Sequence, residues 1–213
     1  MIAHKTMRDL MYDHICQKIR AGEMHASSMI KESVLSQELG VSRTPVREAL
    51  IQLAGEGILE FIPHKGFLIK PMDEQAVRDM LSVLGVLDGL AATLAIPLLT
   101  EKDFVALQNC IDAMDFAIDH GNDDMYLSMQ NLFHEIYLQA CGNDTLCETI
   151  HKLKNRLFKK KYHVEGNEEF LRTLNNEHRH ILELLLKKDA QAVRDYLIEV
   201  HWPPEAANDE VFI

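Results

Sequence analysis

The stretch GVSRTPVREAL, residues 40–50, predicts a tight turn followed by a short helix. Gly40 suits the left-handed conformation that commonly ends a preceding helix. Ser42 or Thr44 then suits the start of the next helix, because their short side chains favour helix N-termini. Pro45 fits the first turn, where a missing backbone N–H breaks no intrahelical hydrogen bond. The stretch therefore predicts two helices that meet at a sharp corner.

The second of these helices has one apolar and one basic face. Arg43 and Arg47 are four residues apart, so they project from the same side. The apolar positions lie on the opposite side and predict an inward stripe: Val46, Ala49, Leu50 and Leu53. In a helix-turn-helix, such a helix lies in the major groove, where arginine can donate two hydrogen bonds to guanine.

The flanking sequence completes a winged helix-turn-helix pattern. Apolar residues from Leu10 to Ile19 recur at helical spacing, and Ser33 suits the start of a short helix that ends near Leu39. Two apolar runs, residues 58–62 and 67–70, flank a Pro-His-Lys-Gly turn and predict a β-hairpin. We therefore expect residues 1–71 to form a DNA-binding domain of three helices and a hairpin.

Charge is unevenly distributed along the 213 residues. The net charge is −11, but residues 1–71 hold 9 Lys and Arg against 8 Asp and Glu. The remainder holds 13 basic and 25 acidic residues, so it would repel a polyanion while the first part would not. No run of 18 apolar residues, secretory signal or CxxC pair is present, so we expect a cytoplasmic protein without a membrane partner.

Residues 72–213 predict an all-α bundle of six or seven helices, so the expected fold class is mainly α. Thr100 and Asp103 have the spacing of a capping box at one helix start. The later helices are expected over about 122–140, 143–161, 166–187 and 189–201.

Longer segments carry a family resemblance. The sequence VLSQELGVSRTPVREALIQLAGEGILEFIPHKGFLIKP is similar to the DNA-binding domain of GntR-family bacterial transcription regulators. LDGLAATLA, NLFHEIYLQACGND and NEHRHILELLLKKDAQAVRDYL resemble the FCD ligand-binding domain of the FadR-type branch. The resemblance implies a homodimeric repressor that binds a palindromic double-stranded DNA operator and responds to a small-molecule effector. It also implies these DNA contacts: Ser42, Arg43, Thr44, Arg47, Lys65 and Gly66.

The effector site departs from the pattern of this branch, which commonly holds a divalent metal with one Asp and three His. His134 and His178 match two imidazole positions, but Gln130 stands where the carboxylate is expected. The third histidine should lie 22 residues after His178, where this chain has Val200; His201 comes one residue late. One residue turns a helix by about 100°, so His201 should point away unless the helix is distorted.

Three interpretations of the site remain. In the first, His134, His178 and a shifted His201 hold Zn²⁺ or Ni²⁺. In the second, the metal is lost and a neutral or more apolar metabolite replaces an organic acid. In the third, His134 and His178 are interior histidines whose hydrogen bonds are satisfied within the protein. The replacements favour the two interpretations without a metal. Leu84 stands where the family has an arginine that anchors a carboxylate, so it also favours a neutral or more apolar effector. The expected effector-binding residues are Gln130, Asn131, His134, Arg156 and His178.

Two other functions are weighed against an effector-responsive repressor. One is a regulator that has lost its effector site and responds through protein partners. The other is a metal-dependent helical-bundle enzyme. The segment HEIYL at residues 134–138 lacks the second histidine of a HExxH site, and no P-loop, GxGxxG or GxSxG is present. The sequence therefore predicts a non-enzymatic protein.

Overall fold

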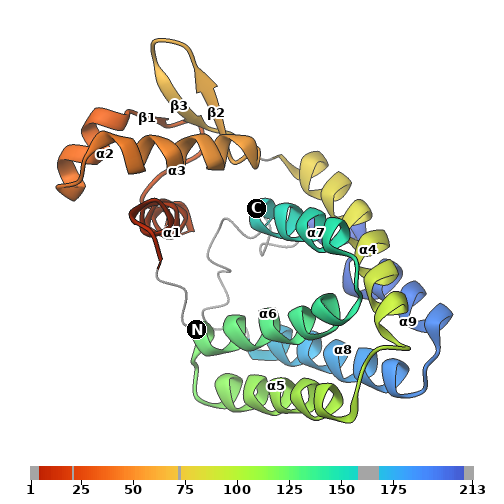
Figure 1. Cartoon of the computed structure of the whole chain (residues 1–213). Helices are drawn as coiled ribbons and strands as arrows, with labels where there is room; N and C mark the ends of the chain where they lie inside the picture. The colour runs from red at the N-terminus through yellow and green to blue at the C-terminus, as the bar shows by residue number, and fades with distance from the viewer. Residues whose placement is uncertain (1–4, 21, 72, 158–167, 209–213) are drawn as a thin grey trace. The chain divides into compact units, whose positions relative to one another are not determined.

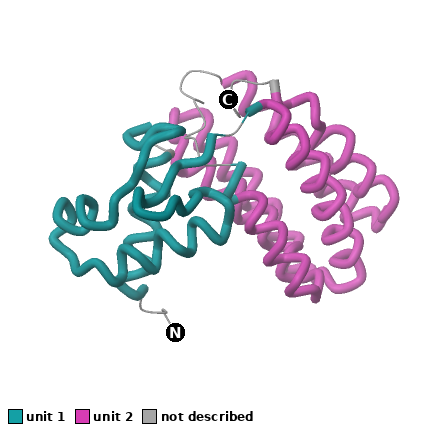
Figure 2. Tube along the Cα trace, turned by 90° about the horizontal axis from the view of Figure 1, so that it is seen from above, with its two compact units in different colours: residues 1–73, 155–161, 213 teal, residues 74–154, 162–212 magenta. Residues whose placement is uncertain are grey.

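The computed structural model describes residues 5–20, 22–71, 73–157 and 168–208. The chain divides into two compact units, coloured separately in Figure 2. Unit 1 comprises residues 1–73 and 155–161 with residue 213, and unit 2 comprises residues 74–154 and 162–212. Figure 1 shows helices with one small sheet, so the predicted fold class, a winged helix-turn-helix followed by a helical bundle, is confirmed.

Unit 1 surrounds one apolar core. Its elements are α1 (Met7–Arg20), β1 (Met29–Ile30), α2 (Glu32–Leu39), α3 (Arg43–Gly55), β2 (Leu59–Ile62) and β3 (Gly66–Ile69). The predicted inward stripe of α3 is confirmed, since its four residues are fully buried. Of the apolar positions expected on the first helix, Met11, Ile15 and Ile19 face the core, whereas Leu10 is exposed.

The corner between α2 and α3 forms as predicted. Gly40 adopts a left-handed φ of 64°, and the N–H of Val41 bonds the carbonyl of Ser36, which closes α2. Ser42 is the N-cap of α3 in an extended conformation. The predicted start of α2 was wrong: α2 begins at Glu32, with Lys31 as its N-cap. Strand β1 ends immediately before Lys31, so the N-cap of α2 lies two residues before Ser33.

The hairpin belongs to a three-stranded antiparallel sheet of order β1-β3-β2. Strand β1 was not predicted, because two residues are too short to show an alternating pattern. Gly66 has a φ of 114°, and a Cβ there would lie 2.4 Å from the carbonyl oxygen of Ile30. The hairpin therefore needs glycine at this position for the close approach of β1.

Unit 2 is helical throughout its described residues. Its elements are α4 (Glu74–Ala95), α5 (Glu101–Asp119), α6 (Asp123–Ala140), α7 (Asp144–Leu157), α8 (Glu168–Leu186), α9 (Ala190–Tyr196), the π-helix η1 (Leu197–His201) and the 3-10 helix η2 (Pro204–Asn208). The capping box of Thr100 and Asp103 is confirmed. The predicted helix end at 161 and helix start at 166 lie outside the described residues.

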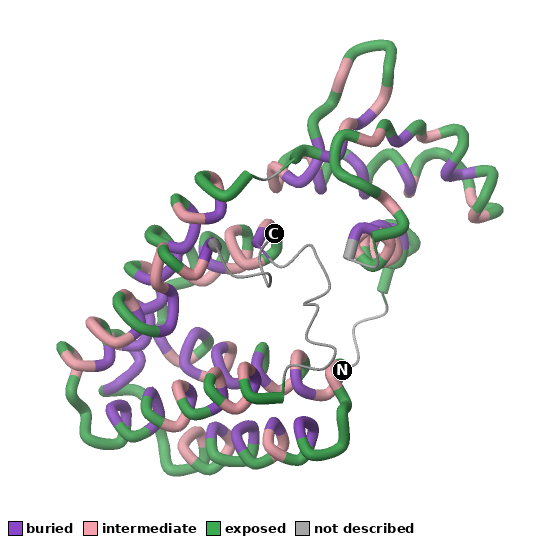
Figure 3. Tube along the Cα trace, turned by 180° about the vertical axis from the view of Figure 1, so that it is seen from behind, coloured by how far each residue is buried: buried purple, intermediate pink, exposed green. Residues whose placement is uncertain are grey.

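The bundle is held by buried faces that Figure 3 colours along each helix. Helix α5 packs against α6 and α8, while α4 packs against α6, α9 and η1. Gly85 allows the last contact to be close, since a Cβ there would lie 3.2 Å from the Cα of Ile198. In the described part of the chain, no helix combines the length and apolar character that crossing a membrane requires.

Candidate DNA-binding face and buried histidine site

The first helical turns of α3 present polar side chains to solvent. Ser42, Arg43, Thr44 and Arg47 are all exposed. The Ser42 side chain makes no capping hydrogen bond, so its hydroxyl is available to another partner. Because the opposite face of α3 is buried, these side chains can contact a ligand without disturbing the core.

Arg47 forms a long ion pair with Glu32 of α2. Its Nε lies 3.6 Å from Oε1 of Glu32, and the Arg47 side chain is 62% exposed. An exposed ion pair of this kind contributes at most about 1 kcal/mol, so a DNA base or phosphate could displace Glu32 easily.

Two further segments of unit 1 add polar groups. Lys65 is exposed at the tip of the β2–β3 hairpin, beside Gly66. At the start of α1, Thr6 and Arg8 line a shallow hollow that Ser42 and Thr44 also line. The start of α1 was not predicted to be near this face, because only folding brings it beside α3.

Three buried histidines from three elements of unit 2 meet in the bundle. His134 comes from α6, His178 from α8 and His201 from the end of η1. One nitrogen from each ring lies within 4.8 Å of those of the other two. The Nε2 atoms of His134 and His201 are 3.2 Å apart. Two nitrogens bound to one tetrahedral zinc ion at 2.0–2.1 Å would lie about 3.4 Å apart.

The π-helix explains why His201 reaches this cluster. In η1 the N–H of Trp202 bonds the carbonyl of Leu197, five residues earlier. A π-turn takes in one residue more than an α-turn, so the late histidine turns back toward the bundle. Val200 is 42% exposed, whereas His201 is 7% exposed. The helix is therefore distorted at this point, and His201 faces the cluster, whereas in a regular helix it would point away.

Hydrogen bonds fix how two of the imidazoles face the cluster. Tyr137 donates its hydroxyl hydrogen to Asp88 over 2.9 Å, so its oxygen accepts from Nδ1 of His134, 2.5 Å away. Nδ1 of His201 donates to Glu177 over 2.8 Å. In the neutral tautomers that follow, both Nε2 atoms carry lone pairs. Two lone pairs at this separation repel unless a cation or a proton lies between them.

Burial makes a proton a poor candidate for that place. It lowers the pKa of His134 to about 3, and Lys154 lowers it further, although Asp88 acts in the opposite direction. Burial also lowers the pKa of His178, as do its two neighbouring imidazoles. Neither ring nitrogen of His178 has a hydrogen-bond partner of ordinary geometry within the described residues. The donor set thus fits a divalent metal with imidazole ligands.

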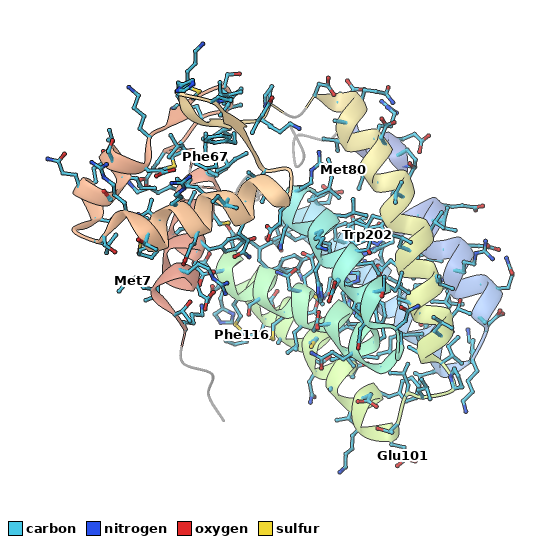
Figure 4. All side chains as sticks on the ribbon, turned by 45° about the horizontal axis from the view of Figure 1, so that its top comes forward. Met7, Phe67, Met80, Glu101, Phe116 and Trp202 are labelled. Atoms are coloured by element: carbon cyan, nitrogen blue, oxygen red, sulfur yellow. The ribbon has the colours of Figure 1, made fainter. Side chains whose placement is uncertain are left out.

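Asp88 organises the surrounding polar groups. Its Oδ2 accepts from the hydroxyl of Tyr137 and, over 2.7 Å, from the indole N–H of Trp202. Burial alone would raise the pKa of Asp88, but Lys154, His134 and Trp202 together hold it below its ordinary value. Figure 4 labels Trp202 inside the bundle. Asp88 therefore stays ionised and indirectly fixes the orientation of His134.

The structure brings together only some of the predicted effector residues. Gln130 is 8% exposed, and its Oε1 lacks a hydrogen-bond partner among the described residues. It lies one helical turn before His134 on α6. Asn131 is exposed. Arg156 belongs to unit 1, where its Nε lies 3.4 Å from the position of a Cβ on Gly57. Leu84 is fully buried.

Several functional candidates were missed from the sequence: Asp88, Tyr137, Lys154, Glu177 and Trp202. Glu177 was detectable in principle, because it adjoins His178. Lys154 lies within a basic run that also suits a solvated helix face. The others come from different helices, and nothing in their spacing connects them before the bundle folds.

Comparisons with known proteins agree with this architecture. Residues 8–69 match the model of the bacterial regulatory proteins of the gntR family, and residues 79–200 match the FCD domain. The chain is 27% identical over 168 residues to the HTH-type transcriptional repressor RspR of Escherichia coli, covering 77% of this chain and 72% of the relative. It is 25% identical over 189 residues to the uncharacterized regulator YdhC of Bacillus subtilis, covering 88% and 84%.

The solved structure of McbR/YncC from Escherichia coli has the same fold. It superposes with a TM-score of 0.78 at 23% identity, covering 92% of this chain and 94% of that one. One family match covers the exposed α3 face with its hairpin, and the other covers most of the bundle, including His134 and His178. The chain therefore belongs to the GntR family of bacterial transcription regulators, in the FadR-type branch with an FCD domain, and it is not an enzyme.

Proposed function

We propose that this regulator is an effector-responsive homodimeric repressor that binds a palindromic operator. The observation that carries the DNA contacts is the exposed polar edge of α3, formed by Ser42, Arg43, Thr44 and Arg47, opposite a fully buried face. We expect the arginines to read guanine in the major groove. We expect the Ser42 and Thr44 hydroxyls and Lys65 to contact phosphate or the minor groove, with Gly66 allowing close approach.

The test of this face is Arg47→Ala measured by fluorescence anisotropy on the protein's own promoter DNA. A lost guanine contact is worth about 1–3 kcal/mol, so specific affinity should fall about 5- to 150-fold. Lys102→Ala, which removes an exposed charge from α5, is the control and should leave affinity unchanged. Unaltered specific binding by Arg47→Ala would show that α3 does not read DNA in this register.

A stripe on α4 supports the homodimer. Val83, Val86, Leu90 and Leu94 are each at least 36% exposed, and their spacing puts them along one side of the helix. We propose that the same stripe of a second copy of the chain covers it, because a palindromic operator requires two-fold symmetry of the protein. Sedimentation equilibrium should give a dimer for the parent chain and a monomer for Leu90→Glu. The control is Val105→Glu, at a 61% exposed position of α5.

We further propose that His134, His178 and His201 hold Zn²⁺ or Ni²⁺. Support comes from the facing Nε2 atoms and from the Nδ1 hydrogen bonds that fix them. Gln130, whose Oε1 has no hydrogen-bond partner among the described residues, is a candidate for a fourth, neutral donor. A metal bound by the three imidazoles would link three helical elements of the bundle.

Metal analysis of protein purified without a histidine tag tests this site. We expect about one transition-metal ion per chain, and its loss in His134→Ala. A metal content well below one per chain, in protein that still binds its operator, would favour the metal-free pocket or a regulator controlled by protein partners. DNA binding and metal binding are thus tested separately.

A further inference from the structure

Cys141 and Cys147 lie close together at the turn that joins α6 to α7 (Figure 1). Their Sγ atoms are 3.6 Å apart, and both cysteines are free thiols. Cys141 is the C-cap of α6 and is buried, whereas Cys147 lies near the start of α7 and is partly exposed. The sulfur atoms of a disulfide are about 2.0 Å apart, so the two thiols need to approach each other by only about 1.6 Å.

The turn between the two helices positions both sulfur atoms. Gly142 adopts a left-handed φ of 69° just after the end of α6. The side-chain oxygen of Asn143 accepts from the N–H of Leu146, and its carbonyl oxygen accepts from the N–H of Cys147. The thiol of Cys147 donates to the carbonyl oxygen of Leu138 over 3.1 Å. Backbone and capping hydrogen bonds therefore hold the pair in place before any oxidation occurs.

The surroundings of Cys147 disfavour its thiolate. Burial raises the pKa of Cys147 to about 11, and its neighbours Cys141, Glu135 and Asp144 act in the same direction. A dithiol resists oxidation when its surroundings stabilise a thiolate, and Cys147 lacks that protection. The thiolate is also the form that attacks a disulfide, so Cys147 reacts slowly at neutral pH. The site thus favours a disulfide at equilibrium, although its first step is slow.

We propose that Cys141 and Cys147 are a reversible redox site, which a low-molecular-weight disulfide converts into a disulfide within one chain. The thiolate of Cys147, the more exposed of the two, attacks the small disulfide, forms a mixed disulfide and releases one thiol. The thiolate of Cys141 then attacks Sγ of Cys147 and releases the second thiol. The protein loses two protons and two electrons, and the small disulfide takes them up to become two thiols.

The new disulfide would restrain α6 relative to α7. The same two helices are joined by the ion pair of Glu135 and His151, whose side chains are 33% and 44% exposed. An exposed ion pair restrains two helices weakly, whereas a disulfide is a covalent link. Helix α6 also carries His134, two turns before Cys141. The inference depends on neither the proposed metal nor the proposed operator.

The test incubates the full-length protein with oxidised glutathione, alkylates the remaining thiols under denaturing conditions and maps the products by mass spectrometry. We expect a link between Cys141 and Cys147 within one chain, with Cys16 and Cys110 still alkylated. Dithiothreitol should restore both thiols. The loop of residues 141–147 is short, so the oxidised parent protein should melt about 5–9 °C above its reduced form.

Cys141→Ser leaves Cys147 without a second thiol, so glutathione should stay attached and the melting temperature should not show this rise. Cys147→Ser, at a partly exposed position, is a second variant that should form no link. Cys16→Ser is the matched control, because Cys16 lies in unit 1, and it should close the disulfide as the parent does. Circular dichroism establishes that each variant is folded.

Three results would overturn the proposal. The first is a stable glutathione adduct on Cys147 of the parent protein, because it would show that Cys141 does not attack it. The second is a parent protein in which both thiols stay reduced after prolonged incubation at pH 8.5. The third is an oxidised parent protein that melts no higher than its reduced form, because the disulfide would then not restrain the helices.

Discussion

Moving the third histidine by one residue tests whether η1 determines the proposed metal site. We compare His201→Ala with the double variant His201→Ala/Val200→His. In a regular α-helix the two positions differ by about 100° and 1.5 Å, so the double variant could restore the site. In this structure Val200 is 42% exposed while His201 is buried. We therefore expect no restoration.

The size of the expected effect follows from the linkage between metal binding and folding. At a free metal concentration 100 times the dissociation constant, metal binding raises the free energy of unfolding of the parent protein by about 2.7 kcal/mol. If losing one of three imidazoles weakens binding 100-fold, the gain at the same concentration falls to about 0.4 kcal/mol. For a protein of this size, the metal-induced rise in melting temperature should fall from about 5–11 °C to about 1–2 °C.

Differential scanning fluorimetry with and without Zn²⁺ measures the metal-induced rise in melting temperature of each protein. Each variant is compared with its own metal-free form, which removes the effect of the substitution on packing. His180→Ala is the control, because His180 is exposed on the same helix as His178 and should leave the full metal-induced rise. A full rise in the double variant would show that the segment is a regular helix in solution, and the proposed role of η1 would be refuted.

Three further predictions concern single residues. Tyr137→Phe removes the oxygen that accepts from His134, so isothermal titration should show about 10- to 100-fold weaker Zn²⁺ binding, and unchanged binding would contradict the role given to this hydrogen bond. Leu53→Ala creates a cavity in the core of unit 1, so urea denaturation should show a loss of about 2–5 kcal/mol, and a loss under 1 kcal/mol would argue against full burial. Gly66→Ala places a Cβ 2.4 Å from the carbonyl oxygen of Ile30, so it should lower both the melting temperature and DNA affinity, whereas a neutral effect would show that the hairpin lies away from β1.

The DNA-binding unit was largely predictable because its signals are local. Gly40, Ser42 and the apolar stripe of α3 act through backbone preferences and helical periodicity, which a short stretch of sequence fully contains. The places where prediction failed involve contacts with distant segments. Strand β1 exists because it pairs with β3, and it moves the N-cap of α2 from Ser33 to Lys31.

The order of the helices, the polar edge of α3 and the positions of His134 and His178 could be predicted from the residues alone. Only the tertiary structure shows that His201 lies beside His134 and His178, because a π-turn adds one residue to a helical turn and the spacing of apolar residues does not reveal it. It also decided that Asp88, Tyr137, Glu177 and Trp202 orient the imidazoles. These groups come from separate helices, and their hydrogen bonds exist only where packing removes water and brings distant side chains within about 3 Å of one another.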